Sequence, residues 1–226
     1  MDILHRTRLL YGDDGIEKLK SATVMVVGCG AVGSFAIEAL ARTGIGHIVV
    51  VDFDCVEASN INRQLFATHS TIGLAKVSVA ANRIHDINPE TCVTELNLFF
   101  DEHTDIETRP DFIIDAIDTV ASKVALYKWA HKNNILLISS MGAASKTDLT
   151  HIKIAPISQT CVCPLAGRIR RAVRDEKLPD FPAVFSTQTP HPVNGHAKNL
   201  GSIVTVTGTF GLMLANYVIG EIVGKK

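Results

Sequence analysis

A glycine-rich loop between a predicted strand and a predicted helix is the feature that most limits how this chain can fold. The apolar run Thr23–Val27 leads into a G-x-G-x-x-G motif made by Gly28, Gly30 and Gly33, and the segment Val32–Arg42 has helical spacing. Glycines at these positions allow a tight turn and let a phosphate approach backbone N–H groups at the helix N-terminus. The loop therefore predicts a nucleotide site on a strand–turn–helix unit.

Strand and helix patterns continue to alternate along the first two thirds of the chain. Short apolar or alternating runs predict strands at Thr23–Val27, His47–Val51, Thr91–Leu96, Phe112–Ile117, Ile135–Ser139 and His151–Ile157. Helical spacing predicts helices at Val32–Arg42, Leu74–Ile87, Ala121–Lys132 and Leu165–Val173. This alternation indicates an α/β, Rossmann-like fold with a largely parallel sheet and helices on both faces. The less regular C-terminal third completes the sheet, and its stretch from Pro179 to Pro192 is expected to be extended and loop-rich.

The charge balance and the cysteine count exclude some classes of protein. The 226 residues include 22 Lys and Arg against 23 Asp and Glu, and the net charge of -1 excludes a globally basic nucleic-acid binder but allows a local basic patch. Five scattered cysteines argue against a disulfide framework and favour a reducing, cytoplasmic compartment. The one close pair, Cys161 and Cys163, is not a C-x-x-C motif, so no structural zinc is expected.

The apolar segment Ile203–Val223 has two interpretations. It has roughly the ~20 residues that cross a bilayer and carries one charged residue, Glu221. Three threonines, three glycines and Asn216 dilute its apolar character. We therefore predict a buried core helix, or a strand followed by a helix, and regard membrane association as the less favoured interpretation.

Charged side chains downstream of the glycine loop are candidates for handling a nucleotide. Asp52 lies 19 residues after Gly33, at the end of the next predicted strand, where a carboxylate accepts hydrogen bonds from ribose hydroxyls. Arg63 and Lys76 follow, and both can stabilise charge on a triphosphate and on a leaving pyrophosphate. Asp118 follows another predicted strand, and a carboxylate among phosphates indicates magnesium. The residues alone leave open solvent-exposed roles for Arg63 and Lys76, and a helix-capping role for Asp118.

A set of short motifs occurs in a fixed order along the chain. They span residues 28–34, 41–46, 51–54, 60–64, 73–76, 87–89 and 115–118. As a set they resemble the ubiquitin-activating-enzyme-like (ThiF/MoeB-type) adenylyltransferase superfamily, over residues from about 5 to 145. The resemblance implies ATP and magnesium as cofactors, and adenylation of a carboxylate. It also implies one adenylating domain, residues 1–226, with a helical arm (1–20), a nucleotide-binding core (21–145) and a substrate-side region (146–226).

The resemblance implies a role for each matching residue. The resemblance has Gly28, Gly30 and Gly33 shape the phosphate loop, while Asp52 holds the ribose and Asp54 contributes to the nucleotide site. It has Asn60, Arg63 and Gln64 place the phosphates, and Lys76 stabilise the α-phosphate and the leaving pyrophosphate. Asp118 would organise magnesium, and Arg8 would reach the ATP phosphates in the other subunit of a homodimer. Arg63, Lys76, Asp118 and Arg8 are accordingly the predicted catalytic residues.

The last third resembles one branch of this superfamily. Residues 161–166, residues 184–188 and the apolar terminal segment match the branch that dehydrates threonylcarbamoyladenosine in tRNA. That resemblance implies adenylation of the threonine carboxylate, followed by a cyclisation that releases AMP. The alternative is an adenylyltransferase that activates a ubiquitin-like sulfur carrier for thiamine or molybdopterin synthesis, with Cys161 or Cys163 as acceptor. A non-catalytic nucleotide sensor and a Rossmann dehydrogenase are weaker alternatives from other classes.

A basic helix supplies a candidate RNA-binding surface. Arg168, Arg170, Arg171 and Arg174 fall within one predicted helix, where the last three share a face. Such a cluster suits RNA phosphates, so these arginines are the predicted tRNA-binding residues. The alternative is a solvated helix whose arginines pair with neighbouring acidic side chains.

Overall fold

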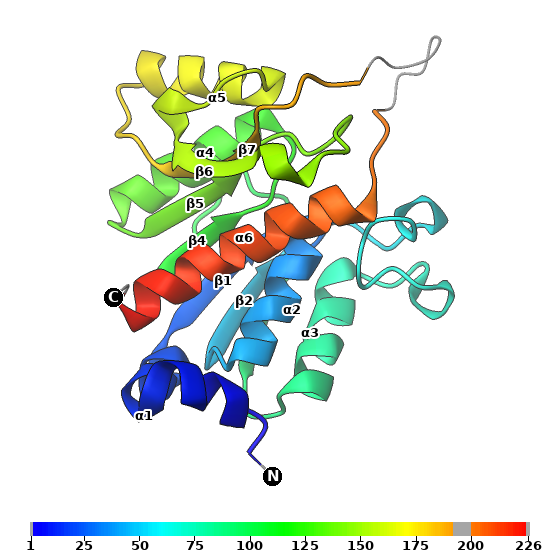
Figure 1. Ribbon diagram of the computed structural model, residues 1–226, viewed down its shortest axis with the longest axis vertical. Coiled ribbons are helices and arrows are strands. Elements are labelled where there is room, and N and C mark those ends of the chain that lie inside the picture. Colours follow the sequence, from blue (N-terminus) through cyan, green and yellow to red (C-terminus); the bar gives the residue numbers. More distant parts are fainter. Residues whose placement is uncertain (1, 192–199, 225–226) are drawn as a thin grey trace.

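A seven-stranded sheet forms the centre of the computed structural model, which describes residues 2–191 and 200–224 (Figure 1). The strand order is β3-β2-β1-β4-β5-β7-β6, and all neighbours are parallel except β6 and β7. The strands are β1 (Thr23–Val27), β2 (His47–Val51), β3 (Cys92–Leu96), β4 (Phe112–Asp115), β5 (Leu136–Ser140), β6 (Ile152–Pro156) and β7 (Pro182–Ser186). The predicted α/β class and largely parallel sheet are confirmed.

Helices cover both faces of this sheet. The α-helices are α1 (His5–Ser21), α2 (Gly33–Thr43), α3 (Lys76–Ile87), α4 (Val120–Lys132), α5 (Pro164–Asp175) and α6 (Val204–Val223); the short 3-10 helices are η1 (Ala58–Asn60), η2 (His69–Thr71), η3 (Leu149–His151) and η4 (Ile157–Gln159). Val24 and Val26 pack with α1, α2, α3 and α6, whereas Met25 and Val27 pack with α4 and α5 on the opposite face. Because both faces are buried, the central strands are largely apolar.

The predicted element boundaries agree with the structure to within two residues. The helix predicted to start at Leu74 starts at Lys76, and the strand predicted to end at Ile117 ends at Asp115. The proline-rich stretch is extended and the C-terminal third completes the sheet, as predicted, but the middle of the stretch is a regular strand rather than loop, because β7 pairs there with both β5 and β6. Pro182 is the first residue of β7, a position where a strand tolerates the missing N–H. Pro192 lies outside the described residues.

The apolar C-terminal segment is a single helix that packs on the core. Phe210, Leu214 and Val218 of α6 are buried, and a Cβ on Gly211 would lie 2.3 Å from the Val32 carbonyl oxygen, so α6 crosses α2 at close range. The predicted core helix is confirmed. Among the described residues, α6 is the one helix long and apolar enough to cross a membrane, and half of its most apolar window is buried inside the fold.

The strand order reverses direction at the centre of the sheet. From β1 the chain adds β2 and then β3 on one side, and β4 then returns to the other side of β1. The loops that leave β1 and β4 therefore diverge at the carboxyl edge of the sheet. In open α/β sheets such a switch point is where ligands bind.

Candidate active site

The glycine loop occupies the switch point, and close backbone contacts require glycine at two of its three motif positions, Gly28 and Gly33. Gly28 has φ +98°, and a Cβ there would lie 2.8 Å from the Ala116 carbonyl oxygen. A Cβ on Gly33 would lie 1.7 Å from the Gly28 carbonyl oxygen. The α2 N-terminus that follows has no side-chain cap. Its first N–H groups are thus suited to an anion such as a phosphate.

Asp52 lies beside this loop, at the end of β2. One carboxylate oxygen accepts the Cys29 N–H at 2.6 Å, and the other accepts the Asp54 N–H at 2.9 Å. Each carboxylate oxygen can accept more than one hydrogen bond, so acceptor capacity remains for ribose hydroxyls.

Asp54 and Lys76 form an ion pair next to Asp52. The Lys76 ammonium lies 2.7 Å from the Asp54 carboxylate, and Lys76 is only 8% exposed. Burial raises the pKa of the Cys29 thiol well above its usual value, with the Asp52 charge raising it and the Lys76 charge lowering it. The charges of Asp52 and Lys76 therefore both act on Cys29 of the glycine loop. The structure thus brings the predicted residues Asp52 and Lys76 together at this loop.

Arg63 and its neighbours are held against the start of α2. The Ser34 hydroxyl accepts the Leu65 N–H at 3.1 Å, which ties the segment after η1 to the first turn of α2. The Arg63 guanidinium donates to the Ser59 carbonyl at 2.7 Å. Asn60 is buried, and its carbonyl accepts the Gln64 N–H at 2.9 Å.

Gln64 faces the glycine loop directly. It is buried, and its side-chain nitrogen would lie 3.8 Å from a Cβ on Gly30. Gly28, Gly30, Gly33 and Gln64 therefore line one side of the switch point. Asn60 and Arg63 lie in the same segment, but their side chains contact residues of that segment, so Gln64 is the predicted phosphate-placing residue that the structure brings to the loop.

Asp118 belongs to the turn that packs against this loop from the other side. A Cβ on Gly28 would lie 3.3 Å from the Ile117 nitrogen, so the turn and the loop are in contact. The Asp118 side chain is exposed and accepts the Thr119 hydroxyl at 3.2 Å. The helix-capping interpretation is wrong, because the N-cap of α4 is Thr119 and no side chain caps that helix.

A single exposed carboxylate at this position is compatible with magnesium. The described residues contain no cluster of three His, Cys, Asp or Glu side chains that could hold a metal alone. Magnesium usually takes one or two carboxylates and completes its octahedron with phosphate oxygens and water. Asp118 therefore fits a magnesium ion that arrives with ATP.

An aromatic pair beside Asp52 was not predicted from the sequence. Phe53 and Phe99 are 55% and 47% exposed, and their rings pack edge to face with centroids 5.0 Å apart. They follow the adjacent parallel strands β2 and β3, so they lie at the same edge of the sheet as the glycine loop. The sequence signal was Phe53 itself, an apolar residue between two aspartates.

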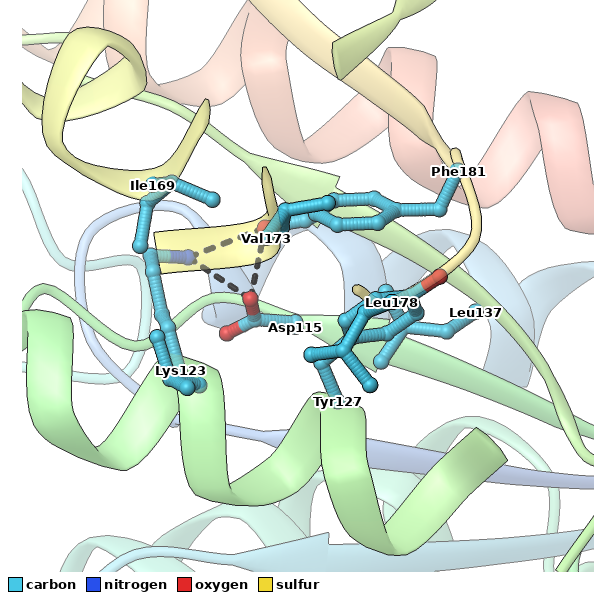
Figure 2. A pocket seen from close by; sticks show the side chains of 10 residues that line it. Asp115, Lys123, Tyr127, Leu137, Ile169, Val173, Leu178 and Phe181 are labelled. Carbon is cyan, nitrogen blue, oxygen red and sulfur yellow. Dashed lines mark hydrogen bonds and ion pairs between the residues drawn. The ribbon is translucent and has the colours of Figure 1, made fainter. Parts of the chain in front are cut away.

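A buried ionic cluster beneath the Asp118 turn was also missed. The Lys123 ammonium lies 2.8 Å from the Asp115 carboxylate, and the Ser139 hydroxyl donates to the same carboxylate oxygen at 2.6 Å. Figure 2 shows the Lys123 side chain reaching from α4 towards Asp115. The sequence signal was Asp115, which lies three residues before Asp118 and stands in a strand of apolar residues.

Arg8 is not brought to the site of its own chain. Its guanidinium is paired with Asp2 and Asp13 on the same arm. A Cβ on Gly44, at the C-terminal end of α2, would lie 2.6 Å from Leu4, so α1 begins at that end. The glycine loop is at the other end of α2, which is about 16 Å long at 1.5 Å per residue.

The four arginines of α5 differ in their surroundings. Arg170 is half-buried and donates to the Thr160 hydroxyl at 2.6 Å, which directs it into the fold. Arg168, Arg171 and Arg174 are exposed, and Arg174 lies 3.5 Å from Asp175. The structure therefore keeps three of the four predicted arginines at the surface.

Cys161 and Cys163 lie at the N-terminus of α5. Cys163 is buried, and its sulfur accepts the Gly142 N–H at 3.3 Å. Cys161 is exposed, and Val162 between them has a left-handed φ of 62°. Burial of Cys163 fits the interpretation of a small packed side chain better than that of an acceptor.

Two known proteins are similar to this one over most of the chain. A tRNA threonylcarbamoyladenosine dehydratase of Bacillus subtilis (strain 168) is 47% identical over 189 residues, which are 82% of this chain and 74% of that protein. The crystal structure of Escherichia coli tRNA N6-threonylcarbamoyladenosine dehydratase in complex with ATP matches with a TM-score of 0.91 and 34% identity, covering 98% of this chain and 94% of that chain.

A third relative is similar over a shorter stretch. The molybdopterin-synthase adenylyltransferase of Escherichia coli (strain K12) is 34% identical over 137 residues, which are 60% of this chain and 54% of that protein. The model of the ThiF family matches residues 4–226. The chain therefore belongs to the ThiF family.

Proposed function

We propose that this protein uses ATP to adenylate the threonine carboxylate of threonylcarbamoyladenosine in tRNA and then closes a ring. The carboxylate oxygen forms a bond to the α-phosphorus of ATP, and the bond to pyrophosphate breaks. The carbamoyl oxygen then attacks the activated carbonyl carbon, AMP leaves, and a carbamoyl N–H proton is lost. The tRNA nucleoside loses one water in total.

The observation that carries this proposal is the extent of the similarity. Similarity to the tRNA dehydratases runs through nearly the whole chain, including the region that follows the nucleotide core. Similarity to the molybdopterin-synthase adenylyltransferase covers three fifths of it. Because the similarity extends through the region that we propose as the substrate side, it favours a tRNA substrate over a sulfur-carrier protein.

The glycine loop and its neighbours would bind ATP across the switch point. The α2 N-terminus receives the phosphates, Asp52 accepts from the ribose, and the adenine attached to that ribose packs on Phe53 and Phe99. Arg63 and Lys76 lie within this frame and stabilise charge that develops on the α-phosphate and on pyrophosphate. Asp118 would help to hold a magnesium ion, and such an ion would further neutralise phosphate charge.

Ring closure places few demands on the protein. The carbamoyl oxygen and the acyl carbon belong to one molecule, so the reaction is intramolecular and needs no protein nucleophile. The site must hold the acyl-adenylate away from water until the ring closes. Because no protein nucleophile is needed, the burial of the Cys163 thiol is consistent with this reaction.

The exposed face of α5 is the proposed tRNA-binding surface. Arg168, Arg171 and Arg174 are available to phosphates, whereas Arg170 supports the fold through Thr160.

Because Arg8 lies far from the site of its own chain, it would complete the site of a second copy in a homodimer. We further propose that residues 1–226 form a single adenylating domain, with an arm (1–20), a core (21–145) and a substrate-side region (146–226). This domain works in the cytoplasm, where tRNA is found.

Pyrophosphate exchange with defined substrates tests the proposal. Exchange of labelled pyrophosphate into ATP should require tRNA that carries threonylcarbamoyladenosine, and unmodified tRNA should not support it. Exchange that depends instead on a small protein ending in Gly-Gly, together with a later transfer step that is lost in Cys161→Ala or Cys163→Ala, would contradict the proposal in favour of sulfur-carrier activation. ATP binding without exchange with either substrate would indicate a nucleotide sensor.

Mixing two inactive variants tests the role of Arg8. Arg8→Ala and Lys76→Ala should each be inactive alone. If Arg8 acts across a dimer, a mixed dimer contains one site with both residues intact, so mixing restores part of the activity. No recovery in a sample shown to contain mixed dimers would contradict the cross-subunit role.

A further inference from the structure

A buried ionic cluster lies directly beneath the turn that carries Asp118. Asp115, Lys123 and Ser139 are 2%, 2% and 1% exposed. Lys123 also donates to the Ser139 hydroxyl at 3.1 Å, so each member contacts the other two. Buried charges are costly unless they are paired and hydrogen-bonded, so a cluster of this kind calls for a structural or functional reason.

The cluster cannot be a nucleophilic site. A serine within reach of a lysine occurs in some hydrolases. Here the cavity that reaches Lys123 and Ser139 has a volume of only about 10 Å³ and is lined by side chains such as Tyr127, Ile169 and Phe181 (Figure 2). That volume holds roughly one water molecule, at ~10–15 Å³ per water. No substrate can reach the serine hydroxyl.

The hydrogen bonds of the cluster instead fix both ends of the Asp118 turn. At its start, the second Asp115 oxygen accepts the Ile117 N–H at 3.0 Å. At its end, the Lys123 N–H donates to the Thr119 carbonyl at 3.0 Å, which closes the first turn of α4. The Lys123 side chain then returns to Asp115. Lys123 therefore connects the two flanks of the turn, and Ser139 joins the cluster to β5.

We propose that Lys123, Asp115 and Ser139 are positioning residues that hold Asp118 in place for adenylation. This inference rests on the proposed function. Asp115 cannot take the role of Asp118 itself, because it is only 2% exposed and its carboxylate is paired with the buried Lys123 ammonium. The exposed Asp118 is anchored through its backbone, since its carboxylate accepts a hydrogen bond from the adjacent Thr119 hydroxyl and makes no hydrogen bond to another element within residues 2–191 and 200–224. Displacement of a catalytic group by ~1 Å can cost roughly 10²-fold in rate.

The variants are chosen so that the fold survives. Removal of one charge alone leaves a buried unpaired partner and is strongly destabilising. The double variant Asp115→Asn/Lys123→Met removes both charges together and keeps similar volumes. Ser139→Ala removes one hydrogen bond to Asp115. Ser122→Ala is the matched control, because Ser122 lies on α4, is equally buried, and its hydroxyl has no partner among the described residues.

Steady-state pyrophosphate exchange gives the first test. The double variant should lose about tenfold or more in kcat while the KM for ATP stays within about twofold. The triple variant Asp115→Asn/Lys123→Met/Asp118→Ala should lose no more kcat than Asp118→Ala alone, because the double change and Asp118→Ala act through the same group. Ser139→Ala should show a smaller loss that Ser139→Thr partly restores, and Ser122→Ala should match the wild type. Full kcat in a folded double variant, or losses that multiply with Asp118→Ala, would overturn the proposal.

Calorimetric ATP binding with magnesium and with EDTA gives a test that needs no turnover. Magnesium should tighten ATP binding to the wild type and to Ser122→Ala, and this gain should shrink in Asp118→Ala and in the double variant alike. An unchanged gain in the double variant would overturn the positioning role. A wild type that binds ATP but exchanges no pyrophosphate would instead contradict the proposed function, so the two failures are distinguishable.

Discussion

The two halves of the sheet are assembled in different ways. On the nucleotide side, the contacts around Asp52 join residues close in sequence: Asp52 accepts from Cys29 over 23 residues, and Lys76 pairs with Asp54 over 22. On the β5-β7-β6 side, Lys146 donates to the Gln188 carbonyl over 42 residues, and Tyr127 donates to the Pro179 carbonyl over 52. The surroundings of Asp52 are thus built by consecutive strand–turn–helix units, which only the Asp118 turn joins from farther along the chain, whereas the opposite side depends on distant loops. Substitutions in the two halves should therefore affect different steps.

Lys76→Ala should have the largest effect, and it should be confined to chemistry on ATP. Loss of a group that stabilises transition-state charge costs about 10²–10³-fold in kcat. Lys128→Ala is the control, since that exposed lysine pairs with Glu176 away from the site. Pyrophosphate exchange and circular dichroism measure the two effects. Wild-type exchange in folded Lys76→Ala would contradict the assignment of this residue.

Gly33→Ala should disrupt the loop geometry itself. The new Cβ would overlap the Gly28 carbonyl oxygen, so the backbone must move, and the free energy of unfolding should fall by about 1–3 kcal/mol or more. Gly201→Ala is the matched control, because nothing lies within 4 Å of its Cβ position. Urea unfolding measures both, and equal stability of the two variants would show that the loop can adapt.

Substitutions on α5 should affect tRNA binding and leave ATP binding unchanged. The triple variant Arg168→Ala/Arg171→Ala/Arg174→Ala should weaken tRNA binding and reduce the salt dependence of log K by about 0.7–0.9 for each tRNA phosphate that an arginine no longer neutralises. Arg170→Ala should lower stability without reducing that dependence, since it donates to Thr160. Binding titrations at several salt concentrations measure the slope. An unchanged slope in the triple variant would place the tRNA surface elsewhere.

Glu38→Gln should have the smallest effect and a defined pH dependence. Burial raises the pKa of Glu38, but hydrogen bonds from Arg83 and Arg42 outweigh it and leave the pKa below its usual value. A carboxylate with a lowered folded-state pKa stabilises the fold above its unfolded-state pKa, and this contribution disappears as the pH falls through the folded-state pKa. The variant should thus be less stable by about 1 kcal/mol or less at neutral pH. Unfolding curves should show this difference shrink as the pH falls through the lowered folded-state pKa of Glu38, and a difference that is constant with pH would contradict the ion-pair origin.

The predictability of the site follows the same division. The motif glycines, Asp52, Asp54 and Lys76 could be placed from the sequence because strand–turn–helix geometry fixes neighbours along the chain. The strand β7 could not be placed from the sequence, because its pairing with β5 joins Ser139 to Ala183, which lie far apart along the chain. The prolines around β7 also favour a loop. The partners of Asp115 were missed for the same reason: Lys123 and Ser139 meet it only after α4 and β5 have packed. The spacing of the α5 arginines predicted their shared face, but the inward turn of Arg170 depends on Thr160.

The most direct measurement is mass analysis of nucleosides from tRNA that carries threonylcarbamoyladenosine, after incubation with the wild-type protein, ATP and magnesium. The proposed function predicts that this nucleoside loses the mass of one water while AMP and pyrophosphate appear in equal amounts. An unchanged nucleoside, with the protein folded and ATP bound, would contradict it.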